Sequence, residues 1–443
     1  MPKVITIVKK TAKYLGLLLL ALLVVVFAAI PLARWETPDD LVAADNAQAL
    51  AIDNVHLVTM AGEEFLSDRQ LLLRDGRIQA IRASGSEVGD EYTLIDGKGG
   101  FVLPGLFDMH THVMDRKYLA LHLAYGVTSV RNMGGYPMHL RWKRELSNGE
   151  WLGSNLFTAA PTLNGKRNSN PFAHKVVEKP GEARELVRRY HAAGYDFIKV
   201  YTRLSVDVFD AIVDEADKLS FAVAGHVPYA VVAEDYRRAT AMVTLEHAEE
   251  IYQGPMSYEY DDEALSAIAL QLRDMGATLT PTLLIFDHLT QIALGKQQFV
   301  DGLRLEYLNP FMRFVESKGS VARWLNAGDK LRNSLAIRNA YFQRITRVLH
   351  ETGVDLLVGS DNGVLYAVPG VSTHDEIELL AQAGLAPPDI LRMATVNAAR
   401  VLAVDDRLGT IEVGKTADLI LAQRDPRIDL ATLRTPQAVI KDG

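Results

Sequence analysis

The sequence contains no cysteine among its 443 residues. Disulfide bonds and thiolate metal ligands are therefore excluded. A transition metal in this protein would have to be bound by histidine, aspartate, glutamate or a chemically modified residue. The 12 histidines are the residues best suited to that role.

A basic surface for nucleic acid is also lacking. The formal net charge is −8, and no block of lysine or arginine occurs outside the N-terminus, which argues against a nucleic-acid partner. The sequence also has no internal repeat and no low-complexity segment. With 48% hydrophobic and 23% charged residues, the composition is that of a globular protein long enough for one large domain and a smaller one.

The N-terminal segment differs from the rest of the chain. Residues 15–33 (LGLLLLALLVVVFAAIPLA) contain no charged residue over 19 positions, close to the roughly 20 that cross a bilayer. We expect a basic cytoplasmic segment (1–14), a transmembrane anchor or signal segment (15–33) and a linker (34–47). No Ala-x-Ala site follows at the usual distance, which favours an uncleaved anchor over a cleaved secretory signal.

Charges on the two sides of this segment predict its orientation. Lysines precede it and acidic residues follow it: Lys3, Lys9, Lys10 and Lys13, then Glu36, Asp39 and Asp40. The positive-inside rule leaves the N-terminus in the cytoplasm and the remainder of the chain outside it, in the periplasm or the extracellular space. A cleaved signal would also export the remainder, as a secreted protein.

The rest of the sequence predicts two structural units. Strand-like runs at both chain ends, residues 48–104 and 406–443, predict a small β-sandwich domain, with a hairpin turn at Asp75-Gly76. Residues 105–405 alternate β-like and helix-like segments. The strand candidates are 107–112, 126–133, 155–163, 196–202, 221–227, 242–248, 277–284 and 354–361. This alternation predicts an α/β fold, a (β/α)8 TIM barrel whose functional groups lie at the C-terminal ends of its strands.

The first barrel strand, FDMHTH, ends in two histidines one residue apart. Because side chains alternate along a strand, His110 and His112 point the same way and could ligate one metal ion. The alternative is a pair of histidines hydrogen-bonded to their neighbours. The other predicted strands support the metal hypothesis, since they also carry ligand-type residues at or near their ends: Lys199, His226, His247 and Asp361.

These residues and their surroundings resemble the metal-dependent amidohydrolase superfamily, in particular its prolidase-like and imidazolonepropionase-like members. PGLFDMHTH, GVTSVRNMGG and LLVGSD are similar to the motifs of its first, second and eighth strands. The stretch from LAPPDILRMATVNAARVL to VIKDG resembles its last helices and closing strands. Asn132 departs from the pattern, because these relatives often have aspartate after the arginine.

The resemblance implies a binuclear metal centre. His110, His112 and Asp361 would bind one divalent ion, and His226 and His247 a second; zinc is the ion that the resemblance leads us to expect. Lys199, carboxylated by carbon dioxide, would bridge them as a carbamate; the alternative is a lysine whose ammonium extends to solvent.

The same resemblance implies a hydrolytic reaction. A water shared by the ions would attack as hydroxide, Asp361 would act as general base and then acid, and a metal ion would polarise the carbonyl of an amide or peptide.

The sequence says less about the substrate. Related deaminases and imidazolonepropionases carry a glutamate three residues after the histidine of the fifth strand; here that residue is Tyr229. This difference favours hydrolysis of amides or dipeptides, with Tyr229 either at the substrate or in packing. Lys166 and Arg167, in the loop LNGKRNSNPFAHK, could bind a substrate carboxylate or belong to a solvated loop.

Further alternatives remain open at this point. The same metals could open a cyclic amide or a lactone, and a barrel without metal could be a non-catalytic binding protein. The helix-like connection 285–353 is unusually long and could form a lid or a partner surface. A homo-oligomer is compatible with the sequence.

Overall fold

The computed structural model describes residues 10, 13–22, 24, 49–62, 65–167, 169–171 and 173–443. The predicted basic segment, the anchor and the linker fall largely outside these residues. Within the part of the chain that is described, no helix has both the length and the apolar character required to cross a bilayer.

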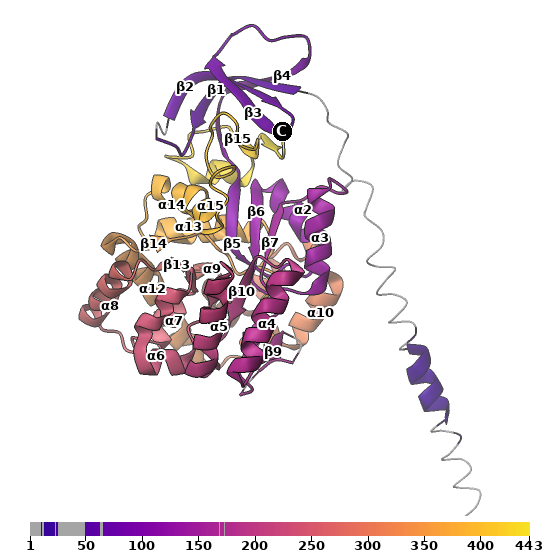
Figure 1. Ribbon diagram of the computed structural model, residues 1–443, viewed down its shortest axis with the longest axis vertical. Helices are drawn as coiled ribbons and strands as arrows, with labels where there is room; N and C mark the ends of the chain where they lie inside the picture. The colour runs from indigo at the N-terminus through magenta and orange to yellow at the C-terminus, as the bar shows by residue number, and fades with distance from the viewer. Residues whose placement is uncertain are drawn as a thin grey trace, which may run out of the picture.

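Both chain ends contribute to one six-stranded sheet at one end of the molecule (Figure 1), in the order β16-β15-β4-β1-β2-β3. Its strands are β1 (Ala49–Val58), β2 (Phe65–Arg74), β3 (Arg77–Ala83), β4 (Tyr92–Pro104), β15 (Leu419–Ala422) and β16 (Ala438–Ile440). β1 and β4 pair in parallel and the other neighbours are antiparallel. The prediction that both ends share a β unit is confirmed. The sandwich is not: because β4 hydrogen-bonds to both β1 and β15, the described strands form a single mixed sheet.

The Asp75-Gly76 hairpin turn is confirmed. β2 and β3 pair with Arg74 opposite Arg77, which leaves a two-residue loop. Both loop residues have positive φ, +52° at Asp75 and +74° at Gly76. Such a turn matches the twist of the flanking strands, and glycine adopts the second position without steric cost.

The middle of the chain forms parallel strands in two sheets. These strands are β5 (Leu106–Thr111), β6 (Val127–Asn132), β7 (Asn155–Thr158), β8 (Thr162–Asn164), β9 (His174–Val176), β10 (Phe197–Val200), β11 (Ala222–Gly225), β12 (Thr244–Glu246), β13 (Thr278–Thr280) and β14 (Asp355–Leu356). Each predicted barrel strand overlaps at least one of them. Every residue of β5 and β6 is buried, as is typical of parallel strands covered on both faces.

Parallel bridges connect the two sheets. One joins Ala159, after β7, to Phe197 in β10, and another joins Thr111 in β5 to Asn362, after β14. Strands β5, β6, β7, β10, β11, β12, β13 and β14 therefore follow one another in a closed ring. All of their C-terminal ends lie on the same side of this ring.

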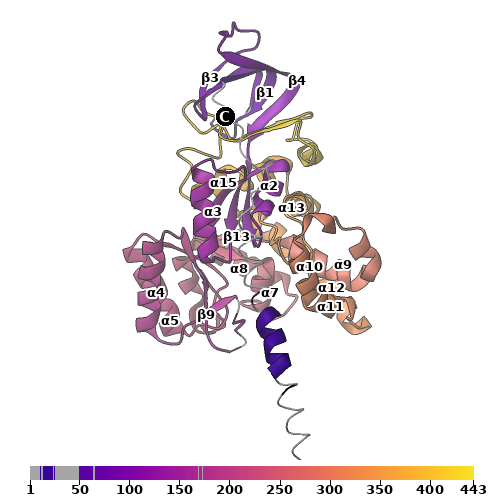
Figure 2. The ribbon, with the colours of Figure 1, turned by 90° about the vertical axis from the view of Figure 1, so that its right-hand side faces the viewer.

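Helices surround the strands (Figures 1 and 2). They are α2 (Lys117–Ala124), α3 (Pro137–Ser147), α4 (Pro180–Ala193), α5 (Val206–Lys218), α6 (Tyr229–Asp235), α7 (Ala248–Gln253), α8 (Asp262–Asp274), α13 (Val371–Gln382), α14 (Pro387–Met393) and α15 (Val396–Val401), with 3₁₀ turns η2 (Tyr236–Ala241) and η4 (Leu430–Arg434). The amphipathic pattern of α5 explains its position, because Val208, Phe209 and Ile212 share one buried face.

The long connection before β14 is helical, as predicted. It contains α9 (Leu283–Asp301), η3 (Leu305–Tyr307), α10 (Pro310–Lys318), α11 (Ser320–Leu325) and α12 (Asp329–Thr352). Figure 2 shows these helices gathered on one side of the ring, away from the six-stranded sheet.

Candidate metal centre

The six predicted ligands come from five strands of the ring. His110 lies in β5 and Lys199 in β10, whereas the other four follow strands directly or within a few residues: His112 after β5, His226 after β11, His247 after β12 and Asp361 after β14. Because these strands are parallel, their C-terminal ends bring residues that are far apart in sequence to one face. All of the six except His112 are buried.

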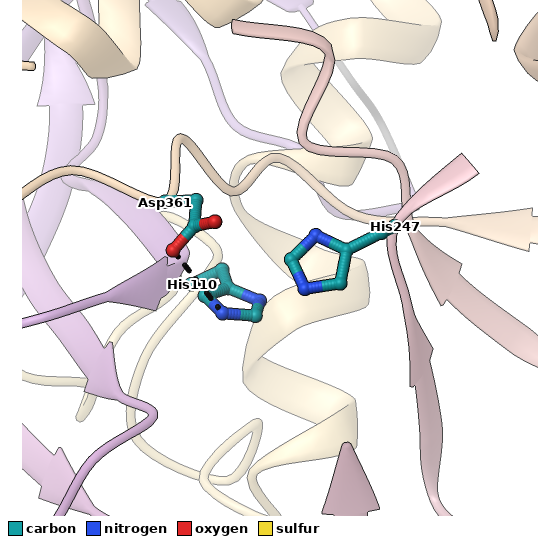
Figure 3. Close-up of side chains that lie close together, drawn as sticks. All are labelled: His110, His247 and Asp361. Atoms are coloured by element: carbon teal, nitrogen blue, oxygen red, sulfur yellow. Dashed lines mark ion pairs between the residues drawn. The ribbon is translucent and has the colours of Figure 1, made fainter. Parts of the chain in front are cut away.

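Asp361 lies between the two histidines of the first strand. Its Oδ1 is 3.0 Å from Nε2 of His112 and 3.5 Å from Nε2 of His110. Figure 3 shows Asp361 beside His110, with His247 facing them. Ligand-type atoms of His110, His247 and Asp361 all lie within 4.8 Å of one another. Oδ1 of Asp361 is buried and accepts no hydrogen bond of good geometry, so this cluster fits a cation that would be its partner.

The remaining predicted ligands continue from this cluster. The ring of His247 is 4.7 Å from that of His110 and 4.7 Å from that of His226, centroid to centroid. Nζ of Lys199 is 3.4 Å from Nε2 of His110. The structure thus brings His110, His112, Lys199, His226, His247 and Asp361 together around one small volume.

Burial favours the neutral forms of four nitrogen donors, His110, Lys199, His226 and His247. It lowers the pKa of His110 and of His226 well below the usual value, with the charge of Lys199 adding to the effect. Burial likewise lowers the pKa of His247 to about 3 and that of Lys199 to about 8. A neutral imidazole has the lone pair that a metal needs, and a neutral amine has the lone pair that reacts with carbon dioxide.

Acidic and hydroxyl groups orient three histidine rings through contacts at Nδ1, on the side of each ring opposite to Nε2. Nδ1 of His110 donates to Glu246 at 2.8 Å, and Nδ1 of His226 donates to Glu250 at 3.0 Å. The ring of His247 pairs through Nδ1 with Thr282 Oγ1 at 2.6 Å. Each of these contacts occupies Nδ1 and leaves Nε2 free for the centre, the arrangement typical of metal-binding histidines.

Glu246 is held by a buried arginine. Nη2 of Arg131 donates to Glu246 at 2.7 Å, its Nε donates to the Met109 carbonyl at 2.6 Å, and its Nη1 donates to Thr244 at 2.7 Å. Both charged side chains are almost completely buried. Burial raises the pKa of Glu246, and the charge of Arg131 opposes this effect.

Asp108 holds the segment that carries Asp361 against β5. It accepts hydrogen bonds from Ser360 Oγ at 2.6 Å and Ser360 N at 3.0 Å, and from Thr373 Oγ1 at 2.7 Å. Asp361, which follows Ser360, has a φ of +52°. A residue other than glycine keeps this conformation only where the surrounding structure stabilises it, as the hydrogen bonds to Asp108 do here.

Sequence reasoning missed Asp108, Arg131, Glu246, Glu250 and Thr282. A signal existed for the two glutamates, because LEHAEE places carboxylates on both sides of His247. No sequence pattern pointed to the pairing of Glu246 with His110, which lies 136 positions away.

The residues predicted to contact substrate lie in different settings. Lys166 and Arg167 are exposed in a turn between β8 and β9. Tyr229 begins α6; its hydroxyl donates to Gln253 Oε1 at 3.3 Å, and Arg203 lies over its ring at 4.7 Å.

Asn132, which departs from the family pattern, is buried, and its side chain forms a hydrogen bond with the backbone of the loop after His112. Its Oδ1 accepts from Val113 N at 3.0 Å, and its Nδ2 donates to Thr158 Oγ1 at 3.0 Å. It therefore fixes the loop that follows His112.

A ring of parallel strands with a buried cluster of histidine, aspartate and lysine at its C-terminal ends defines a class of metal-dependent hydrolases. Residues 101–443 match the Amidohydrolase family, and the chain belongs to that family. The family resemblance predicted from sequence is confirmed.

Two relatives illustrate the breadth of the similarity. The imidazolonepropionase of Symbiobacterium thermophilum is 26% identical over 408 residues, which are 82% of this chain and 88% of that protein. A structure from Bifidobacterium longum assigned to the prolidases is 27% identical, with a TM-score of 0.69 over 89% of this chain and 94% of the other.

A further structure, bottromycin amidohydrolase, is also 27% identical, with a TM-score of 0.73 over 90% of this chain and 87% of the other. An Xaa-Pro dipeptidase, 21% identical with a TM-score of 0.67 over 89% of this chain and 98% of the other, shares the fold.

Proposed function

We propose that this protein is a binuclear metal-dependent amidohydrolase that cleaves an amide or peptide bond, with dipeptides as its substrates. The observation that carries the proposal is the convergence of His110, His247 and Asp361, whose ligand-type atoms lie within 4.8 Å of one another, with the buried Oδ1 of Asp361 accepting no hydrogen bond of good geometry. The similarity to a structure assigned to the prolidases favours the peptide bond.

The donor set suits two divalent ions, most simply zinc. His110, His112 and Asp361 would hold the first ion, and His226 and His247 the second. Two close cations need an anionic bridge, and a carbamate on Lys199 would provide it after reaction with carbon dioxide. The lowered pKa of Lys199, about 8, favours that reaction because it increases the neutral amine at physiological pH.

The ions would supply Lewis-acid polarisation of the carbonyl and a lowered pKa for the attacking water. The chain's own part in the reaction centres on Asp361. Burial acts to raise the pKa of Asp361, but the close contact with His112 and the charges of His112, His247 and Lys199 outweigh it, so the pKa is lowered and the carboxylate stays ionised. Asp361 can therefore accept the proton of the nucleophile and return it to the leaving nitrogen.

The experiment is metal analysis of the purified full chain combined with a panel of mixed dipeptides. Two ions per chain and release of free amino acids are the expected result. Less than one ion under conditions that supply zinc and bicarbonate would contradict the binuclear centre and favour a non-catalytic binding protein.

A cyclic amide is the second candidate, because the chain is similar to an imidazolonepropionase over 408 residues. Opening of hydantoin-type or imidazolone-type rings or of lactones, without cleavage of any dipeptide, would favour this candidate. The metal centre would be the same in both cases.

We also propose that the body of the protein lies outside the cytoplasm, anchored by residues 15–33. The uncharged length of that segment and the charges on its two sides support this location. A protease added to intact cells with a permeable outer layer should digest the body; a body protected under those conditions would contradict the proposed orientation.

A further inference from the structure

Helix α10 exposes an apolar face that nothing in the described chain covers. Phe311 is 70% exposed, Phe314 61% and Val315 42%, and their spacing of three and four residues places them on one side of the helix. None of the residues of α10 is buried. A helix normally places its apolar side chains against the core, so this face is suited to a separate partner.

Polar contacts fix the opposite side of this segment to the catalytic face of the ring. Glu316 accepts from Leu365 N at 3.0 Å, and the Tyr366 hydroxyl donates to the Arg313 carbonyl at 3.1 Å. Asn309, just before the helix, donates to Asp115 at 2.8 Å. The loops contacted are those that follow Asp361 and His112, so α10 lies beside the end of the ring that carries the predicted ligands. Figure 2 shows α10 among the helices gathered on one side of the ring.

Helices α10 and α11 carry more basic than acidic residues, although the whole chain carries −8. The basic residues are Arg313, Lys318 and Arg323, and the one acidic residue, Glu316, accepts the hydrogen bond from Leu365 N. Aromatic side chains with a basic surround are typical of segments that lie in the headgroup region of anionic membranes.

The sequence also limits the distance to a membrane. Residues 15–33 carry no charge, and residues 34–48 connect them to β1. Even fully extended, that connection spans no more than about 55 Å. If residues 15–33 enter a bilayer, the body remains close to it at all times.

We propose that the face formed by Phe311, Phe314 and Val315 docks in the headgroup region of the anionic bilayer that receives residues 15–33. This inference rests on the expected anchor and not on the proposed hydrolase activity. A second copy of the chain is the less favourable occupant, because a two-fold contact would bring the same basic residues together.

The absence of cysteine makes a direct test available. In the full chain, F314C gives a single site for a nitroxide label, and I428C gives a matched control at a side chain that is 81% exposed in the C-terminal region. Both proteins are placed in nanodiscs that contain phosphatidylglycerol. We expect the label at 314 to collide several-fold more with oxygen, which enters lipid, than with a water-soluble nickel chelate. The label at 428 should show the reverse preference.

F311E added to F314C should shift the label at 314 towards the behaviour of the control. Water-like behaviour at both positions would overturn the proposal, as would a full chain that stays in solution. Spin–spin broadening of the label at 314 that occurs only when two copies share one nanodisc would assign the face to a dimer. That result would also overturn the proposal.

Discussion

Glu246 accepts the Nδ1 hydrogen of His110 at 2.8 Å, on the edge of the ring opposite to Nε2, which faces Asp361. Arg131 neutralises Glu246 from the other side at 2.7 Å. One buried ion pair therefore fixes the orientation of a predicted metal ligand. Its energetic role and its functional role can be separated by experiment.

Loss of one partner of this ion pair should destabilise the fold. Glu246→Gln leaves the buried charge of Arg131 unpaired, which typically costs about 3–5 kcal/mol. The double variant Glu246→Gln with Arg131→Met should lose less stability than the sum of the two single variants. Denaturant titration of the four proteins measures the coupling, and additive losses would contradict it. Glu91→Gln, in an exposed pair with Arg74, is the control and should leave stability unchanged.

Glu250 should affect metal binding more than stability. It holds Nδ1 of His226 at 3.0 Å, and removal of such a partner typically lowers metal affinity about 10- to 100-fold. Glu250→Ala should show this loss in competition with a chelator, and Glu250→Gln, which keeps an acceptor oxygen, a smaller one. Equal affinities for Glu250→Ala and the exposed control Glu259→Ala would show that Glu250 has no such role.

Asp361→Asn should abolish most of the turnover while the protein stays folded. An amide cannot accept the proton of the nucleophile, and a general base contributes on the order of 100- to 10,000-fold. Steady-state rates with the best dipeptide measure the effect, and circular dichroism checks the fold. Asp406→Asn makes the same chemical change in an exposed loop and should retain full activity. Undiminished turnover in Asp361→Asn would exclude the proposed role.

Carboxylation of Lys199 should depend on pH in a defined direction. Burial lowers the pKa of this lysine to about 8, so the neutral, reactive amine increases as the pH rises through that value. At a fixed concentration of dissolved carbon dioxide, incorporation of labelled carbon into the metal-free protein should be roughly 15-fold faster at pH 8 than at pH 6.5, because the neutral fraction of the amine rises by that factor. The rate should level off above about pH 9. Lys199→Arg should incorporate none there, and a rate that does not change with pH would contradict the prediction.

The lowered pKa of Lys199 also has a consequence for stability. The unfolded chain binds the lysine proton up to a pKa near 10.5, whereas the folded chain releases it near 8. Between these values the unfolded state binds more protons, so the free energy of unfolding of the metal-free protein should rise with pH across this window. Lys199→Met should remove that slope in denaturant titrations at pH 8 and pH 10.

Much of this site was predictable from sequence because the information is local. Each ligand-type residue lies in or just after a short apolar run, and parallel strands bring such positions to one face. His110, His112 and Asp361 could therefore be grouped although more than two hundred positions separate them. The same local patterns predicted the Asp75-Gly76 turn and the helical connection before β14.

Other features depend on distances that no local pattern encodes. Glu246 follows the alternation of a buried strand, but its pairing with His110 and Arg131 requires the spacing between neighbouring strands of the folded ring. The sequence at the two chain ends predicts strands but not which strands pair. Only the hydrogen-bonding order shows that they form one mixed sheet and not a sandwich. The outward face of α10 is likewise invisible in its sequence, because an amphipathic helix looks the same whether its apolar side meets a core or is left uncovered. The sequence by itself thus determined which ligand-type residues lie at the strand ends. The side chains that hydrogen-bond to these ligands and fix their orientation were decided only by the tertiary structure, because they come from elements far apart in the chain.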